Sequence, residues 1–209
     1  MRLFPLVIFT FAALLLVGCI TPGQRLEPHL VHLVKEGSSQ REVEKLIGKP
    51  NYTVTSSGDS SVAHYEFVRR NDSAQRLLFG NLASEPGDIL LRHLSILYNE
   101  KSIAEKVLFY QSVTPFRTGI GKASAGTVVH PEALKQITKG FSTEKSLMRQ
   151  FGEPQLKTLD TKGNVVLEWY YAKAEMGFLR NKNDMQVLSV VLDQSGRVVD
   201  HALSDSSSR

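Results

Sequence analysis

Few side chains in this 209-residue chain have the types and spacing that catalysis or metal binding requires. His29 and His32 lie three residues apart on a segment with helical periodicity, but no third metal ligand follows at a recognisable spacing. Gly119-Ile120-Gly121-Lys122 has the outline of a phosphate-binding loop. However, Phe116 stands where that loop needs glycine, and Ala123 stands where it needs Ser or Thr. No serine has the surroundings of a nucleophile elbow, and the carboxylates are scattered. We therefore predict no enzymatic activity, no metal site and no cofactor.

The side chain with the most specific predicted chemistry is Cys19, the only cysteine of the chain. A single cysteine excludes an internal disulfide and a cysteine-based zinc cluster. It follows a positive start at Arg2 and an almost wholly apolar run from Leu3 to Val17. That run is about 15 residues long, whereas a membrane-spanning helix needs roughly 20. The N-terminal segment therefore has the features of a secretory signal peptide.

The end of this segment, Leu16-Val17-Gly18-Cys19, resembles the lipobox of bacterial lipoproteins. The resemblance implies that residues 1–18 are removed and that the Cys19 thiol carries diacylglycerol. Ile20 stands where lipoproteins retained in the inner membrane usually have Asp, so we expect the outer membrane, with the protein anchored by its lipid on the periplasmic face. Several acyl chains anchor a protein far more firmly than one chain does. The alternative is a plain signal peptide or anchor helix in which the cysteine occurs by chance.

The remaining residues contain two copies of one helical pattern. Each copy opens with a segment that has Pro at its start and Gly at its end, Pro28–Gly37 and Pro131–Gly140, as expected for a short helix. A second helix follows in each copy. Ser39 and Glu42 have the spacing of a capping box in the first copy, and Ser142-Thr143-Glu144 opens the helix in the second. Both helices end in Gly-x-Pro, because Gly adopts the left-handed terminus and Pro cannot continue a helix.

Strands are predicted after each helical pair. Apolar and aromatic residues alternate with polar ones, and the alternating aromatics (Tyr65, Phe67, Trp169 and Tyr171) are expected to be core residues. Such alternation, with turn residues between the runs, is typical of an antiparallel meander with one buried face. The opposite face would be either a partner surface or a sheet face with ordinary solvent exposure, and the sequence leaves both open. Its members are His64, Glu66, Val68, Leu97, Glu168, Tyr170 and Val191.

These patterns predict an α+β protein with two tandem units, each made of two helices and a three-stranded antiparallel sheet. The helices would cover the apolar face of each small sheet. The predicted layout is a signal peptide at 1–18, a tether at 19–26, repeat 1 at 27–111, a linker at 112–130, repeat 2 at 131–204 and a disordered tail at 205–209.

The segment from Gly37 to Pro50, with its hydroxyl cap, Val43 and the Ile47-Gly48-Lys49-Pro50 ending, resembles the signature of the BamE/SmpA (OmlA) family of outer-membrane lipoproteins. The resemblance covers both repeats. The tandem arrangement is similar to that of the β-lactamase inhibitory protein, in which two such units share one concave sheet surface. The resemblance implies a binding or scaffolding lipoprotein that acts as an accessory of outer-membrane protein assembly or in envelope integrity. An inhibitor or ligand-binding lipoprotein that uses the joint sheet surface is the alternative.

Composition and loop content point to a protein partner. Apolar residues make up 42% of the chain and charged residues 22%, with a formal net charge of +4. This is ordinary globular usage, and the basic residues form no stripe that would bind nucleic acid. Two loops at equivalent positions combine apolar residues with arginine, and loop tips are normally polar. The first cluster is Arg76, Leu78 and Phe79, and the second is Phe178, Leu179 and Arg180. We expect both clusters to dock on an envelope partner or a membrane, or else to fold back on their own domain.

Overall fold

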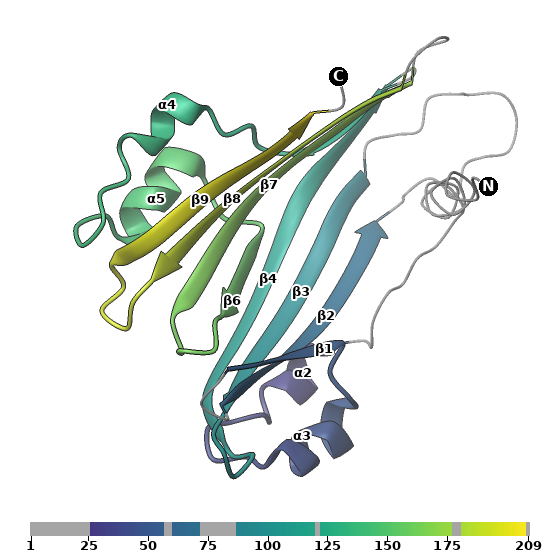
Figure 1. The fold of residues 1–209 in the computed structure, drawn as a ribbon. Helices are drawn as coiled ribbons and strands as arrows, with labels where there is room; N and C mark the ends of the chain where they lie inside the picture. The colour runs from purple at the N-terminus through teal and green to yellow at the C-terminus, as the bar shows by residue number, and fades with distance from the viewer. Residues whose placement is uncertain (1–25, 57–59, 72–86, 120–121, 177–180, 208–209) are drawn as a thin grey trace, which may run out of the picture.

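The computed structural model describes residues 26–56, 60–71, 87–119, 122–176 and 181–207 (Figure 1). We call residues 26–119 the first half and residues 122–207 the second half. The first half contains α2 (Pro28–Val31), α3 (Gln40–Ile47), β1 (Tyr52–Thr55), β2 (Ser61–Asn71), β3 (Gly87–Tyr98) and β4 (Ala104–Gly119). The second half contains β5 (Lys122–Gly126), α4 (Pro131–Leu134), α5 (Glu144–Phe151), β6 (Leu156–Leu159), β7 (Val165–Met176), β8 (Asn181–Leu192) and β9 (Val198–Ser207).

The longer helices begin and end where the sequence predicts. Ser39 caps α3 in a complete capping box with Glu42, and Thr143 caps α5 in an equivalent box with Ser146. Gly48 and Gly152 end these helices with positive φ angles of 85° and 80°. The preceding helices are shorter than the Pro-to-Gly segments suggest. α2 and α4 are each four residues long.

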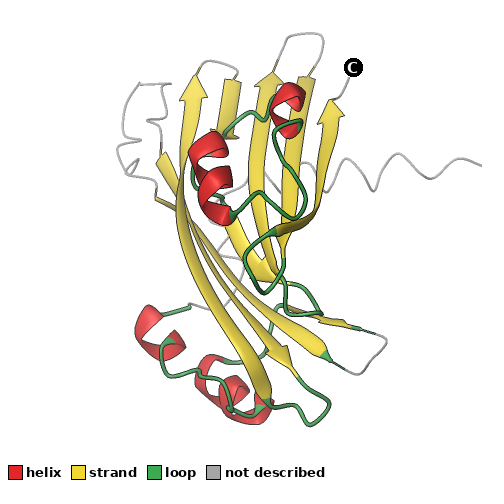
Figure 2. Ribbon diagram, turned by 90° about the vertical axis from the view of Figure 1, so that its left-hand side faces the viewer, coloured by secondary structure: helices red, strands yellow, loops and turns green. Residues whose placement is uncertain are grey.

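The prediction of two separate helix-helix-sheet units is wrong. The strands form one antiparallel nine-stranded sheet in the order β1-β2-β3-β4-β5-β7-β8-β9, and β6 pairs with β7 off this path. The sheet curls along its length, and the helices in the described residues are few and short (Figures 1 and 2). The protein is therefore mostly β rather than an α+β protein with two small sheets.

Most of segment 112–130, expected to be a linker, belongs to this sheet. The second part of β4 pairs with β5, with Phe116 opposite Ala125. β5 then pairs with β7, with Ala125 opposite Ala172. The small polar and alanine residues of β5 fit between two long strands, where they continue the backbone hydrogen bonding from one half to the other. Residues 205–207, expected in a disordered tail, extend β9.

Both helical pairs cover the same face of the sheet. Residues paired across neighbouring strands project from the same face, and successive residues alternate between faces. Phe116 therefore shares a face with Ala125 and Ala172, whereas Phe109 of β4 and Trp169 of β7 project from the opposite face. Phe109 packs against the core under α2 and α3, and Trp169 lies in the core under α4 and α5. The side of the sheet without helices thus belongs to both halves, and β6 covers part of it over the first half.

Each half has its own core between its helices and the sheet. The predicted core aromatics Tyr65, Phe67 and Trp169 are buried, which confirms the prediction for these three. Tyr171, also predicted for the core, is only partly buried, because it lies further along β7, opposite Gly126 and Gln186. In the first half, Tyr65 and Phe67 pack with Val31, Val34, Val43, Ile47, Leu94, Ile96 and Tyr98. In the second half, Trp169 packs with Val129, Ile137, Leu147, Phe151, Leu167, Leu188, Val190, Leu192 and Val198.

A third, smaller core joins the halves. Leu159 of β6 is buried against Val62 and Leu97 of the first half, and Leu108 and Val165 pack around them. Backbone groups of the second half also bind side chains of the first. The Tyr110 hydroxyl donates to the Pro154 carbonyl at 2.7 Å, and the Lys106 ammonium donates to the Gly163 carbonyl at 2.7 Å. β6 therefore packs on the strands of the first half, on the side of the sheet without helices, and joins the two halves.

Candidate functional site

The side of the sheet without helices carries a polar and aromatic cluster to which both halves contribute. We call this side the shared face. Tyr52 pairs with His64, and Glu66 follows two residues later on the same face of β2. Glu168 of β7 pairs with Ser189 of β8, and Tyr170 follows on the same face. β-Strand alternation thus places these side chains together.

The first-half part of the cluster centres on the Glu66 carboxylate. The Tyr52 hydroxyl donates to its Oε1 at 3.2 Å, and Nδ1 of His93 lies 3.5 Å from the same oxygen. His93 and Tyr52 hold the pKa of Glu66 below its usual value, although burial opposes them. Burial and the Glu66 charge raise the pKa of Tyr52. The Tyr52 ring stacks on His64 with 4.5 Å between ring centroids.

The second-half part centres on the Glu168 carboxylate. Its Oε2 accepts a hydrogen bond from the Tyr170 hydroxyl, and its Oε1 accepts one from the Ser189 hydroxyl at 3.1 Å. Burial raises the pKa of Tyr170, and the charges of Glu168 and Glu66 raise it further. Glu168 likewise contributes to the raised pKa of Tyr52. The two carboxylates and two phenols therefore lie within electrostatic reach of one another, although they come from different halves.

Behind Glu66 lies a buried network of two imidazoles and one hydroxyl. The Thr158 hydroxyl lies 3.0 Å from Nε2 of His93 and 3.3 Å from Nδ1 of His64, and the two imidazoles are 3.2 Å apart. Burial, helped by the neighbouring His93, lowers the pKa of His64 to about 4. His64 is therefore neutral at neutral pH and can accept a hydrogen bond.

Glu66, His93 and Thr158 have the residue types of a carboxylate-imidazole-hydroxyl triad. In hydrolases that order activates the hydroxyl as a nucleophile. Here the imidazole of His93 is fully buried, and the Thr158 hydroxyl is shared between two imidazoles. The arrangement is suited to fastening β6 to the first half rather than to acyl transfer.

The predicted loop and lipid sites lie outside the described residues. These are Cys19 and the two loop clusters, Arg76, Leu78 and Phe79, and Phe178, Leu179 and Arg180. His29 lies in α2 and His32 directly follows it. Within the described part of the chain, no group of three or more His, Cys, Asp or Glu side chains is placed to hold a metal ion.

Comparison with protein-family models, with curated proteins and with solved structures finds no match for this chain. In the described residues, the helices are too short or too polar to cross a bilayer.

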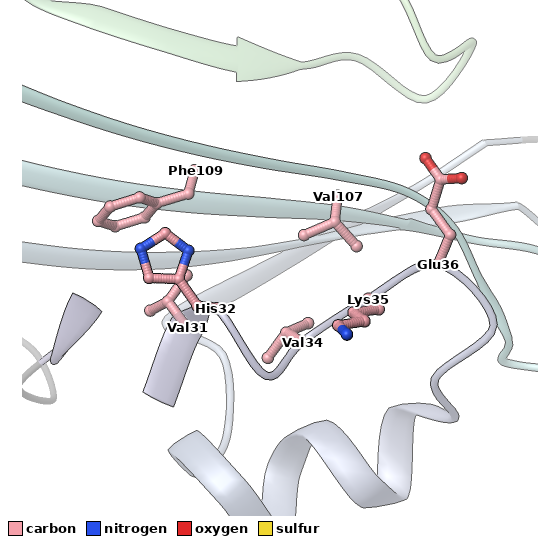
Figure 3. Close-up of a pocket in the computed structure, with 7 residues that line it drawn as sticks. All are labelled: Val31, His32, Val34, Lys35, Glu36, Val107 and Phe109. Carbon is pink, nitrogen blue, oxygen red and sulfur yellow. The ribbon is translucent and has the colours of Figure 1, made fainter. Parts of the chain in front are cut away.

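A groove of about 460 Å³ lies on the helix side of the first half, between the end of α2 and β4 (Figure 3). Val31, Val34, Val107 and Phe109 give it an apolar wall, and His32, Lys35 and Glu36 line its polar part. The apolar residues also belong to the core or pack against it. No converging set of hydrogen-bonding groups distinguishes this groove from the edge of the core.

Sequence reasoning placed His64, Glu66, Glu168 and Tyr170 on one strand face but missed several of their neighbours. His93 lies four residues before Leu97, which the alternation assigns to the polar strand face. Extending the same alternation toward the N-terminus places His93 on that face too. Thr158 and Tyr52 lie on short strands of four residues, which carry too little periodicity to be recognised.

Proposed function

We propose that this protein is a lipid-anchored binding and scaffolding protein of the bacterial envelope that recognises a protein partner through the shared face. The observation that carries the proposal is the convergence of Tyr52 and Glu66 from the first half with Glu168 and Tyr170 from the second half. Tyrosines are enriched in protein interfaces because they combine a large apolar ring with a hydrogen-bonding end.

Exposed apolar side chains around this cluster support a partner surface. Val54 of β1 is 46% exposed and Met185 of β8 is 49% exposed, and both project from the shared face. Tyr52 is 45% exposed. The shared face thus offers apolar and aromatic contacts from both halves beside its polar groups, and protein interfaces combine apolar area with hydrogen-bonding groups. We propose no enzymatic role for the shared face, because its hydroxyls and imidazoles are already hydrogen-bonded within the protein.

The proposed location is the periplasmic face of the outer membrane, with the protein anchored through acyl chains on Cys19. The lipobox-like segment before Cys19 and the Ile at position 20 support this location. The resemblance of Gly37–Pro50 to the BamE/SmpA signature supports a role beside the outer-membrane protein assembly machinery or in envelope integrity.

An inhibitor or ligand-binding lipoprotein is the second candidate, since both halves contribute side chains to one face of the sheet. The two candidates use the same face and differ in the partner. Crosslinking in intact cells separates them, because recovery of assembly-machinery subunits favours scaffolding and recovery of a soluble enzyme favours inhibition.

The use of the shared face is tested by placing a charge on it. Val54→Arg and Met185→Arg add a cation to opposite halves of this face, and Phe141→Arg adds one to the loop between α4 and α5, where Phe141 is 76% exposed. Affinity purification of the acylated protein should recover the same partner with the wild type and with Phe141→Arg. We expect at least a tenfold loss with each of the other two variants. Equal recovery with all three would refute the proposal.

The arginine-containing loops provide an independent docking prediction. Replacing Phe79 and Phe178 by Ser should leave the melting temperature unchanged and reduce partner recovery if these side chains dock on a partner. A large fall in melting temperature would instead mean that they pack on their own domain.

A further inference from the structure

Glu66 and Glu168 are carboxylates without a lysine or arginine partner in the described residues. Their hydrogen-bond partners are hydroxyl groups, and the His93 imidazole lies 3.5 Å from Glu66. The lysine ion pairs of the described chain lie elsewhere: Glu132–Lys135, Glu144–Lys157, Glu175–Lys122, Glu175–Lys173 and Asp200–Lys139. Within the described ranges, two carboxylates of the shared face are thus free of lysine and arginine, although the formal net charge of the chain is +4.

A buried polar atom next to Glu66 also lacks a hydrogen-bond partner in the described residues. His93 is fully buried, and its Nδ1 has no hydrogen-bond partner in the described residues. It is directed toward Glu66 Oε1 across 3.5 Å, which is longer than a good hydrogen bond. Native proteins leave few buried polar atoms unsatisfied, and such atoms often mark functional sites. The hydrogen-bonding capacity that converges on Glu66 is therefore incomplete in the free protein.

The tyrosines complete an environment for a cation. The hydroxyls of Tyr52 and Tyr170 donate to the carboxylates, which fixes both rings beside the negative charges. A ring face attracts a cation through its quadrupole, and the attraction grows when the site is partly dehydrated. Tyr52 and the Glu66 side chain are 45% and 36% exposed, so the centre of the patch is open to a partner.

We propose that Tyr52, Glu66, Glu168 and Tyr170 form a subsite for an arginine side chain presented by the protein partner. A guanidinium group is planar, stacks on aromatic rings and binds carboxylates through paired hydrogen bonds, whereas an ammonium is a compact point charge. Two carboxylates beside two tyrosines match the guanidinium better. This inference rests on the proposed function, since it names the chemistry by which the shared face recognises its partner.

The direct test titrates the acylated protein, held in detergent micelles and carrying ¹³C-labelled tyrosine, with an acetylated and amidated tri-arginine peptide. Tyr52→Phe and Tyr170→Phe assign the two ring signals. We expect saturable shifts of both signals in the wild type, and at least threefold weaker binding of a tri-lysine peptide. Absence of saturable shifts at both rings would overturn the inference, and so would equal binding of the two peptides.

Charge-removing variants provide the matched comparison. Glu66→Gln combined with Glu168→Gln should weaken tri-arginine binding at least tenfold, because Gln keeps the hydrogen-bond acceptor but removes the charge. Glu175→Gln, which removes a carboxylate paired with Lys122 and Lys173, should bind as the wild type does. If the double variant fails to fold, Glu66→Gln alone should bind at least threefold more weakly. Wild-type affinity in a folded Gln variant would refute the subsite.

Failure of this inference is distinguishable from failure of the proposed function. The double Gln variant leaves Val54 and Met185 in place, so partner recovery that persists in it would retain the shared face and reject the arginine subsite. If the protein binds the tri-arginine peptide but its partner recovery is insensitive to Val54→Arg and Met185→Arg, the arginine subsite is retained and the proposed function of the shared face is rejected.

Discussion

The Thr158 hydroxyl lies 3.0 Å from Nε2 of His93, and this contact joins β6 of the second half to β3 of the first. The two residues are far apart in sequence, and both belong to the buried network where β6 covers part of the shared face. Because the same hydroxyl also lies 3.3 Å from Nδ1 of His64, one small side chain connects two imidazoles of different strands.

Thr158→Val should destabilise the protein by about 1–2 kcal/mol, since a methyl group leaves buried imidazole nitrogens without a partner. The measurement is the free energy of unfolding from urea denaturation. Thr158→Ser is the control, because it keeps the hydroxyl, and it should retain most of the stability. A Val variant as stable as the wild type would mean that the two imidazoles satisfy each other without Thr158.

The unfolding free energy should depend on pH through His64. Its pKa falls from 6.5 to about 4 on folding, chiefly because of burial and then because of His93. Between these values the unfolded chain binds more protons than the folded protein, so stability is full above about pH 6.5 and falls as the pH drops toward 4.

Glu66 titrates in a different window from His64. Its pKa is lowered from 4.5, so it adds a loss of stability only below about pH 4.5. Urea denaturation between pH 5 and 7 therefore measures the pH dependence of the unfolding free energy that His64 causes, without that of Glu66. His64→Gln should be less sensitive to pH in this range than the wild type. An identical pH dependence of the two proteins would show that His64 is not the responsible group.

Gly126→Ala should be strongly destabilising. Gly126 has a φ of +82°, and a Cβ atom there would lie 1.8 Å from the Tyr170 carbonyl oxygen, so the junction of β5 with β7 would have to open. Gly37 provides a matched control, because its φ is +88° but a Cβ atom would meet nothing within 4 Å. We expect Gly37→Ala to cost about 1–2 kcal/mol from backbone strain alone. Melting temperatures should rank Gly126→Ala well below Gly37→Ala, and the reverse order would contradict the described strand junction.

Leu159→Ala should weaken the core between the halves. Leu159 is almost fully buried against Val62 and Leu97, and truncation of such a residue typically costs about 2–5 kcal/mol. Because Trp169 is the only tryptophan and lies in the second half, its fluorescence reports on that half alone, while far-UV circular dichroism reports on both. The wild type should give coincident transitions by the two methods. Well-separated wild-type transitions would mean that the halves unfold independently.

Local features of the fold could be predicted because their causes are local. The cap at Ser39, the Gly48 terminus and the alternation around Tyr65 and Trp169 depend on neighbours within a few residues. The merging of all strands into one sheet depends instead on β5. Its sequence Lys122–Gly126 has no alternation of large apolar residues, so nothing local marks it as a strand.

For the same reason, the candidate site could be predicted only in part from the sequence. Glu66 and Glu168 could be assigned to a strand face, but their closeness follows from the pairing of β7 with β5 and β6, which no short-range pattern encodes. The contact of Thr158 with His93 likewise requires the fold of both halves.

The central claim is that one partner is recognised by both halves through the shared face. A photo-crosslinking amino acid at position 52 and another at position 185 test it most directly in cells that make the acylated protein, with position 141 as the control. We predict that positions 52 and 185 capture the same protein, identified by mass spectrometry, and that adducts at both are reduced when Glu66 and Glu168 are replaced by Gln. Different partners at the two positions, or the same adduct at position 141, would contradict the claim.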